Sequence, residues 1–206
     1  MWWLTAVALA ASPPLVHVDR QGRMLYVLDN QRAVLHQEPI GIGRGGLGEK
    51  VSMSDFVTPL GTFTVDLVLE DSGQHNAIAP SLRDRWTGDP TYGALVEPQS
   101  GLTTLYRNMS SLDFNGDQAP DRAYGVAYVG LDSASAITGP KMRLFRGTPY
   151  WYSIALHGTP SSEQLGQARS GGCVHVSAPL LRRLIREGTL AVGQTVRIAD
   201  GPPTIK

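Results

Sequence analysis

The sequence predicts a mainly β domain with a small helical component. Short runs of alternating or continuous apolar residues recur along the chain, and clusters of Gly, Asp, Asn and Pro separate them. This is the pattern of strands joined by turns, and only one segment combines the start and stop signals of a helix. The 206 residues, of which 42% are hydrophobic and 17% charged, are enough for one compact domain with a sizeable core.

The expected strands start with a hairpin, in which residues 15–18 and 24–28 flank a polar turn that contains Gly22. A strand over residues 33–36 leads into the glycine-rich residues 39–46. No helical pattern follows these glycines, so they predict a bulged strand and a flexible loop rather than a phosphate-binding loop. Further strands are expected over residues 58–65, 125–129, 150–156 and 195–198.

Two segments depart from this strand pattern. The expected helix runs from Ala178 to Glu187, with Ser177 as its N-cap and Gly188 as its terminator. Residues 66–123 are polar, irregular and rich in turn residues. So long a loop inside a compact domain is usually functional, so this insert is expected to be a lid or a binding insert.

The charge balance excludes some classes of partner. Lys and Arg together number 18, as do Asp and Glu, so the formal net charge is +0. A nucleic-acid-binding protein would carry a basic footprint, and a membrane-surface protein would carry a polybasic patch. The sequence therefore predicts neither nucleic acid nor an anionic membrane surface as a partner.

The first twelve residues are apolar and end close to Ala8-Leu9-Ala10, the small-x-small pattern of a signal-peptide cleavage site. No Lys or Arg precedes this run, so a plain hydrophobic arm is the alternative to a signal peptide over residues 1–12. The run is too short to cross a bilayer, and no other stretch is long and apolar enough for a transmembrane helix. We expect export to the periplasm or cell envelope.

The chemistry is expected around one cysteine and one histidine. An apolar strand ends at His157, and Cys173 follows 16 residues later, behind Gly171 and Gly172. An imidazole can take the proton of a thiol and so activate it as a nucleophile. The glycines allow a sharp turn whose N–H groups point outward, where they can stabilise an oxyanion.

In these features the chain resembles the L,D-transpeptidases, the YkuD domain family. The matching motifs are His157-Gly158 and the run from Ser170 to Val174, and residues 39–43, 58–63 and 139–142 look like further family segments. The resemblance implies a mixed β-sandwich or barrel-like catalytic fold with one main helix after Cys173. It implies a catalytic domain over residues 15–200, with the insert at about 66–123.

The resemblance also implies the residue roles. Cys173 would be the nucleophile and His157 its base, and the backbone carbonyl of Gly158 would orient the imidazole. Backbone N–H groups of Gly171, Gly172 and Cys173 would bind the oxyanion. The implied reaction attacks peptidoglycan stem peptides through a thioester, which an amine then resolves, giving a 3→3 cross-link or attaching an envelope protein. No cofactor is implied.

Two positions depart from the family pattern. Gly171 stands where many relatives have His, and His175 stands where Arg or Asn is usual. If the residue at position 175 binds a substrate carboxylate, His175 would do so weakly and in a pH-dependent way. Ser170 and His175 are therefore expected as supporting residues, His175 either as a structural hydrogen-bonding group or as a second titrating group near the thiol.

Alternatives remain for the function. Water in place of the amine would make the protein an L,D-carboxypeptidase or endopeptidase, and loss of activity would leave a non-catalytic wall-binding module. An unrelated thiol protease would leave the upstream family motifs unexplained.

A calcium loop is a further candidate within the insert. Residues 113–117 carry oxygen side chains at alternating positions, and a further carboxylate, Asp121, follows four residues later. The Glu that completes an EF-hand loop is missing. The candidate ligands are Asp113, Asn115, Asp117 and Asp121. The alternative is an acidic turn that contains Asn-Gly.

Overall fold

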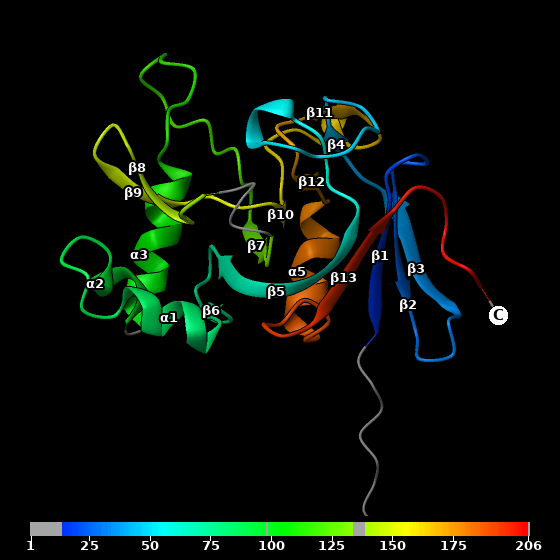
Figure 1. Cartoon of the computed structure of the whole chain (residues 1–206), viewed down its shortest axis with the longest axis horizontal. Helices are drawn as coiled ribbons and strands as arrows, with labels where there is room; N and C mark the ends of the chain where they lie inside the picture. The colour runs from blue at the N-terminus through cyan, green and yellow to red at the C-terminus, as the bar shows by residue number, and fades with distance from the viewer. Residues whose placement is uncertain (1–13, 98, 134–138, 206) are drawn as a thin grey trace, which may run out of the picture.

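The computed structural model describes residues 14–97, 99–133 and 139–205 (Figure 1). The expected signal peptide or hydrophobic arm over residues 1–12 lies outside these residues. No helix within the described part has the length and hydropathy needed to cross a membrane.

The described strands confirm the predicted mainly β fold. One mixed sheet runs in the order β12-β10-β7-β5-β13-β1-β2-β3, with β6 paired to β5. Its strands are β1 (Leu15–Asp19), β2 (Met24–Leu28), β3 (Val34–Pro39), β5 (Gly61–Glu70), β6 (Ala77–Ile78), β7 (Ala127–Leu131), β10 (Ala155–His157), β12 (Val174–His175) and β13 (Thr195–Ala199). Two small pairs complete the β structure, β4 (Ile42–Gly43) with β11 (Ala168–Ser170) and β8 (Met142–Phe145) with β9 (Thr148–Trp151).

Strand β5 joins the two halves of this sheet. Its first residues pair with β13, and from Val65 onward it pairs with β7, with a register shift between Val65 and Leu67. Figure 1 shows β5 as a long curved strand that crosses the middle of the molecule. A bulge of this kind bends a strand, so the sheet curls along β5.

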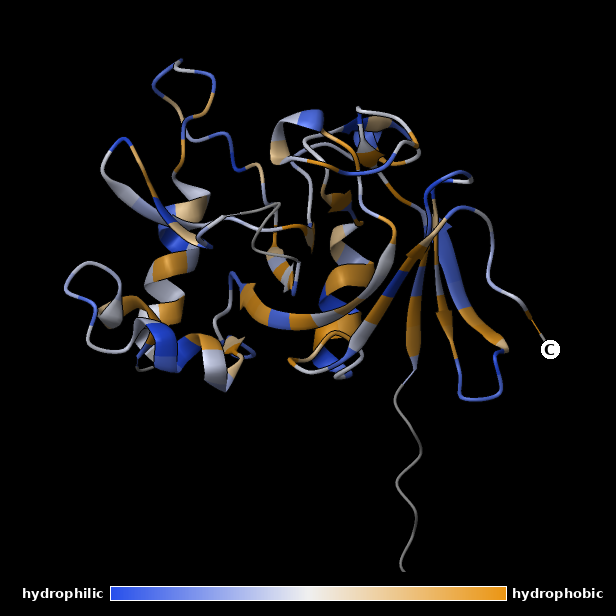
Figure 2. Cartoon of the chain, in the orientation of Figure 1, coloured by the Kyte–Doolittle hydropathy of each residue, from blue (hydrophilic) through white to orange (hydrophobic). Residues whose placement is uncertain are grey.

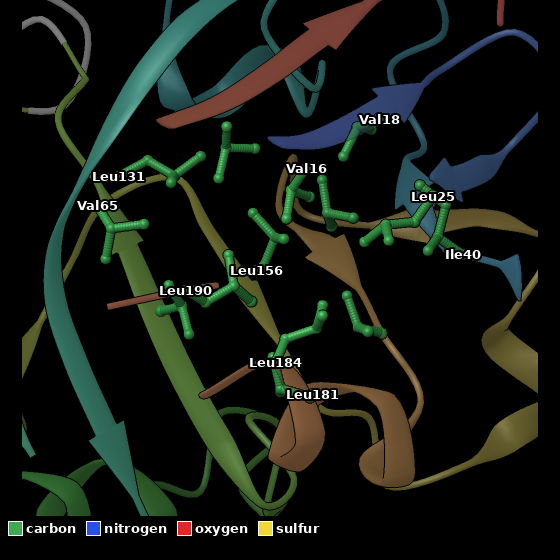
Figure 3. Packing of buried hydrophobic residues seen from close by; sticks show 14 of the residues in the cluster. Val16, Val18, Leu25, Ile40, Val65, Leu131, Leu156, Leu181, Leu184 and Leu190 are labelled. Carbon is green, nitrogen blue, oxygen red and sulfur yellow. The ribbon is translucent and has the colours of Figure 1, made fainter. Parts of the chain in front are cut away.

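Helix α5 (Ala178–Arg186) covers the main core and confirms the predicted helix. Ser177 Oγ accepts a hydrogen bond from the Leu180 amide, and Gly188 follows the helix at φ +75°. Its apolar face is buried against the sheet, where the side chains of β1, β5 and β7 meet it (Figure 3). Figure 2 shows the same concentration of hydrophobic residues along these strands and this helix.

The irregular loop expected over residues 66–123 is wrong, because this part of the chain contains helices and strands, whereas its role as a lid or binding insert stays a prediction. Strand β5 extends to Glu70, and the insert forms α1 (Pro80–Trp86), α2 (Gly93–Val96) and α3 (Gln99–Ser110). The buried residues of α3 recur at helical spacing, at Leu102, Leu105, Tyr106 and Met109. The Gly- and Pro-rich flanks concealed this short pattern. The buried residues of α3 pack with residues of β8 and β9 in a second apolar cluster, which contains the buried Trp151.

The single strand expected over residues 150–156 is two strands. The chain leaves β9 after Trp151 and enters β10 at Ala155. At the break, the Ser153 amide donates to Tyr128 Oη at 3.1 Å, and Ser153 O accepts from Tyr128 Oη at 3.0 Å. A side chain from β7 therefore replaces the strand partner that Ser153 would otherwise have. Short 3₁₀ turns, η1 (Met53–Asp55) and η2 (Ser162–Gln164), lie in the loops after β4 and β10.

Candidate active site

One cleft of about 690 Å³ contains most of the predicted site residues. His157, Ser170, Gly171, Cys173 and His175 all line it. Two of the calcium candidates, Asn115 and Asp121, also line this cleft from the side of the insert. Residues that are far apart in the sequence therefore meet at one concave surface, as expected for a ligand or active site.

Parallel pairing of β10 and β12 brings the histidine and the cysteine to the same edge of the sheet. Leu156 lies opposite Val174 and His157 opposite His175, and Cys173 directly precedes β12. Since side chains alternate along a strand, Cys173 and His175 point to the same face. Figure 1 shows the ends of β10 and β12 beneath the β4–β11 pair, and Ser170 of β11 lines the cleft.

His157 is held in one tautomer and one orientation. Its Nδ1 lies 2.6 Å from the backbone oxygen of Gly158. A carbonyl oxygen only accepts, so Nδ1 carries the proton and Nε2 is left as the acceptor. The ring stacks on Tyr128 at 6.0 Å between centroids and meets the edge of Tyr124 at 5.2 Å. The Gly158 carbonyl therefore accepts from the imidazole and fixes the orientation of the ring.

Burial makes His157 a neutral group. Desolvation and the neighbouring His175 lower the pKa of His157 to about 3, and the hydrogen bond to Gly158 opposes this shift. The His175 ring lies 4.8 Å away, and burial lowers the pKa of His175 to about 4. Both imidazoles are thus uncharged at neutral pH and able to accept a proton.

The thiol of Cys173 is also neutral in this structure. Burial raises the pKa of Cys173 to about 11, although the Ala155 amide and the charge of Lys50 oppose the shift. The half-buried Sγ donates to Ser153 O at 3.7 Å, and among the described residues no hydrogen bond joins it to His157. The resting site therefore contains a neutral thiol and a neutral imidazole rather than a thiolate–imidazolium ion pair.

This resting state predicts a particular pH profile for alkylation of Cys173 by iodoacetamide. Because the thiolate reacts and the thiol pKa is about 11, the rate is expected to rise roughly tenfold per pH unit from about pH 6 to 10. Mass spectrometry of the intact chain measures this rate, since Cys173 is the single cysteine of the sequence. A rate that is constant between about pH 5 and 8 would instead show a preformed ion pair.

The turn before Cys173 is clamped by Ser170. Its Oγ donates to the backbone oxygen of Cys173 at 2.5 Å and accepts from the Gly172 amide at 3.1 Å. Gly172 has φ +119°, where a side chain is strained, whereas a Cβ on Gly171 would meet open space. The chain therefore requires glycine at 172, and the position of Gly171 has room for a side chain.

His175 supports the site through its backbone and is otherwise buried. It exchanges two backbone hydrogen bonds with Gly41, at 3.0 and 2.9 Å. The residue is 7% exposed, and its Nδ1 has no hydrogen-bond partner among the described residues. A neutral, enclosed ring of this kind does not replace the charge of an arginine at neutral pH.

The candidate calcium residues lie in an exposed loop whose carboxylates bind its own amides. Asp113 accepts from Gly116 and Gln118, and Asp121 accepts from the Phe114 amide and the Asn115 side chain. In the described part of the chain, no three His, Cys, Asp or Glu side chains are grouped to hold a metal ion. The hydrogen bonds are those of an acidic turn, and calcium binding stays a prediction.

Sequence reasoning missed the two arginines of the cleft. Arg44 follows β4, Arg169 lies in β11, and both line the cleft. The guanidinium carbon of Arg44 lies 3.7 Å from the centre of the Phe56 ring, a cation–π contact. The only signal was an arginine inside the glycine-rich residues 39–46, and a single charge in a loop has no specific meaning by itself.

The chain was compared with known proteins. No curated protein sequence matches it. Among solved structures, Bdellovibrio bacteriovorus Bd1075 is similar at 18% identity and a TM-score of 0.48, with 96% of this chain and 51% of that chain covered. An L,D-transpeptidase from Xylanimonas cellulosilytica is similar at 16% identity and a TM-score of 0.43, with 92% and 62% covered.

A variant of the helical cell shape determining protein Pgp2 from Campylobacter jejuni is similar at 14% identity and a TM-score of 0.50. The alignment covers 95% of this chain and 50% of that chain, so this chain spans about half the length of the solved protein. This similarity supports the fold. The L,D-transpeptidase catalytic domain, YkuD, matches residues 13–198, which is most of the sequence. The chain therefore belongs to the L,D-transpeptidase catalytic domain family.

Proposed function

We propose that the chain is a peptidoglycan L,D-transpeptidase that transfers an acyl group through Cys173. The observation that carries this proposal is the meeting of His157 and Cys173 in one cleft, at the adjoining ends of β10 and β12. The imidazole is fixed by Gly158 with Nε2 as its acceptor. The family acts on peptidoglycan, whose stem peptides provide the carbonyl and the amine that this chemistry needs.

In the first step Cys173 Sγ leaves Ser153 O and attacks the carbonyl carbon of the third residue of a donor tetrapeptide. The thiol proton passes to His157 Nε2 as the C–S bond forms, because both groups start neutral. His157 then gives the proton to the amine of the terminal D-alanine as the C–N bond breaks. The products are a thioester on Cys173 and free D-alanine.

The negative charge on the carbonyl oxygen needs hydrogen-bond donors. The Gly172 amide is bound to Ser170 Oγ, whereas within the described chain the amides of Gly171 and Cys173 have no hydrogen bond. We assign oxyanion binding to these two amides, and to Gly172 only if Ser170 releases it. Such donors are effective because they are already oriented when the charge develops.

In the second step an acceptor amine attacks the thioester carbon. His157 takes a proton from the amine, the C–N bond forms, the C–S bond breaks, and Sγ is protonated again. A side-chain amine of a second stem peptide gives a 3→3 cross-link, and an amine of an envelope protein gives a protein attached to the wall. Water in the same position would give hydrolysis.

Incubation with tetrapeptide muropeptides tests the proposal. Transfer gives a dimer with the mass of two muropeptides less one alanine, whereas hydrolysis gives a monomer that has lost alanine. If neither product forms and the protein still binds peptidoglycan, the non-catalytic wall-binding function replaces the proposal. Because the substrate is in the wall, we also propose that the protein is exported to the periplasm or cell envelope, which cell fractionation tests.

The arginines of the cleft are expected to bind the carboxylates of the stem peptide. A charge-assisted hydrogen bond contributes about 1.5–3 kcal/mol when shielded from water, and exposure reduces this for Arg44 and Arg169. Arg44→Ala is therefore expected to raise KM for the donor roughly fivefold to tenfold with little change in kcat. The control is Arg197→Ala, because Arg197 is an exposed arginine of β13 that does not line the cleft. An equal effect of both changes would contradict this role.

A further inference from the structure

A buried lysine lies behind the turn that carries the nucleophile. The Lys50 side chain is 2% exposed, and its Nζ donates to Val57 O and to Asp55 Oδ1, each at 2.9 Å. Lysine is seldom buried unless its charge is paired, because desolvation of an ammonium group is costly. None of the steps described above uses this charge, so its place in the fold needs a reason.

Lys50 lies beside the residue that precedes Cys173, on the side where a side chain would project. A Cβ placed on Gly172 would lie 3.0 Å from Val57 O and 3.3 Å from Lys50 Nζ. The Lys50 ammonium and the Val57 carbonyl that it binds therefore lie on the side of Gly172 where a side chain would project. This contact also explains why the turn needs glycine at 172 in addition to its φ of +119°.

Asp55 orients the ammonium toward this turn. Its carboxylate accepts from the amides of Val51, Ser52 and Val57 as well as from Lys50. Burial opposes ionisation, but these hydrogen bonds hold the pKa of Asp55 well below its usual range. The negative end of the pair is thus fixed in the loop of η1, and the positive end lies next to Gly172.

We propose that Lys50 is a positioning residue of this active site, whose buried ammonium supports the Gly172 turn and stabilises negative charge on Cys173 and on the oxyanion bound beside it. The effect of Lys50 on the oxyanion rests on the proposed function, whereas the effect of Lys50 on the Cys173 thiol does not depend on it. Charges in a poorly solvated site interact more strongly than charges in water. The same charge opposes the rise that burial causes in the thiol pKa.

Three variants of the full chain separate this role from simple stability. Lys50→Met removes the charge and keeps an unbranched side chain, and Asp55→Asn removes the countercharge and leaves the lysine. Lys141→Met is the matched control, because Lys141 is also buried and paired, with Asp66, but away from Gly172. The measurement is the rate of Cys173 alkylation by iodoacetamide against pH, with thermal unfolding recorded for each variant.

We expect Lys50→Met to raise the thiol pKa by about one unit and to slow alkylation at pH 8 about threefold to tenfold. Asp55→Asn is expected to act in the opposite direction and to speed alkylation about twofold to threefold. Lys141→Met is expected to lower the unfolding temperature and leave the pH profile unchanged. A loop that is merely loosened cannot produce shifts of opposite sign.

The inference is overturned if Lys50→Met and Asp55→Asn shift the profile in the same direction, or if neither shifts it. Should Lys50→Met fail to fold, Asp55→Asn decides alone, since an unchanged or slower alkylation rate would contradict the proposal. Alkylation needs no peptidoglycan, so its outcome is independent of the muropeptide assay. A protein that shows the opposite shifts but no transfer product would keep this inference and lose the proposed function.

Discussion

Cys173→Ala is expected to abolish acyl transfer, with a loss of at least about 10⁴-fold in the rate of muropeptide turnover. The variant has no atom that can form the thioester, and positioning alone cannot replace a covalent nucleophile. The Cys173 side chain is small and half-buried, so the truncation should change the unfolding temperature little. The measurement is product formation from tetrapeptide muropeptides, analysed by mass.

A carbapenem provides an independent readout of the same residue, because an activated cysteine is expected to open its β-lactam ring and retain it as an acyl adduct. The intact protein should gain the mass of one inhibitor, and peptide mapping should locate it on Cys173. Cys173→Ser is the matched control, since it keeps the shape and the hydrogen bond to Ser153 O but is a much weaker nucleophile. Full activity of either variant would refute the assignment of the nucleophile.

His157→Asn is expected to lower the rate of acylation by roughly 10³-fold at pH 7. Asparagine can still donate to the Gly158 carbonyl, but it cannot accept the thiol proton. Acylation in the variant then depends on the small thiolate fraction of Cys173, whose pKa is about 11. Its rate should therefore rise about tenfold per pH unit across the neutral range.

The wild-type rate should also rise with pH, but in a more acidic range than the rate of His157→Asn. Protonation of His157 removes the base, and desolvation together with His175 lowers the pKa of His157 to about 3. Wild-type acylation should therefore fall only at acidic pH, near this value, and stay nearly level around neutrality. His36→Asn, on the distant strand β3, is the control and should keep the wild-type profile. A wild-type profile as steep as that of His157→Asn would show that His157 is not the base.

The elements that local patterns specify were predicted well. The N-terminal hairpin, β13 and helix α5 carry their turn, alternation and capping residues within a few positions of one another, so the sequence is sufficient for them. The insert was predicted poorly, because α1 and α2 are short and the buried residues of α3 pack against strands far away in the sequence, β5 and β9.

Residue type and spacing alone specify the N-terminal hairpin, β13, helix α5, the family motifs and the identities of the expected nucleophile and base. Contacts in the folded chain are needed to see that the thiol donates to Ser153, that Arg44 lines the cleft and that Lys50 lies beside Gly172. These contacts join residues separated by tens of positions, and the protonation of Cys173 and His157 follows from burial. Burial and long-range contact are properties of the folded chain, so no local pattern contains them.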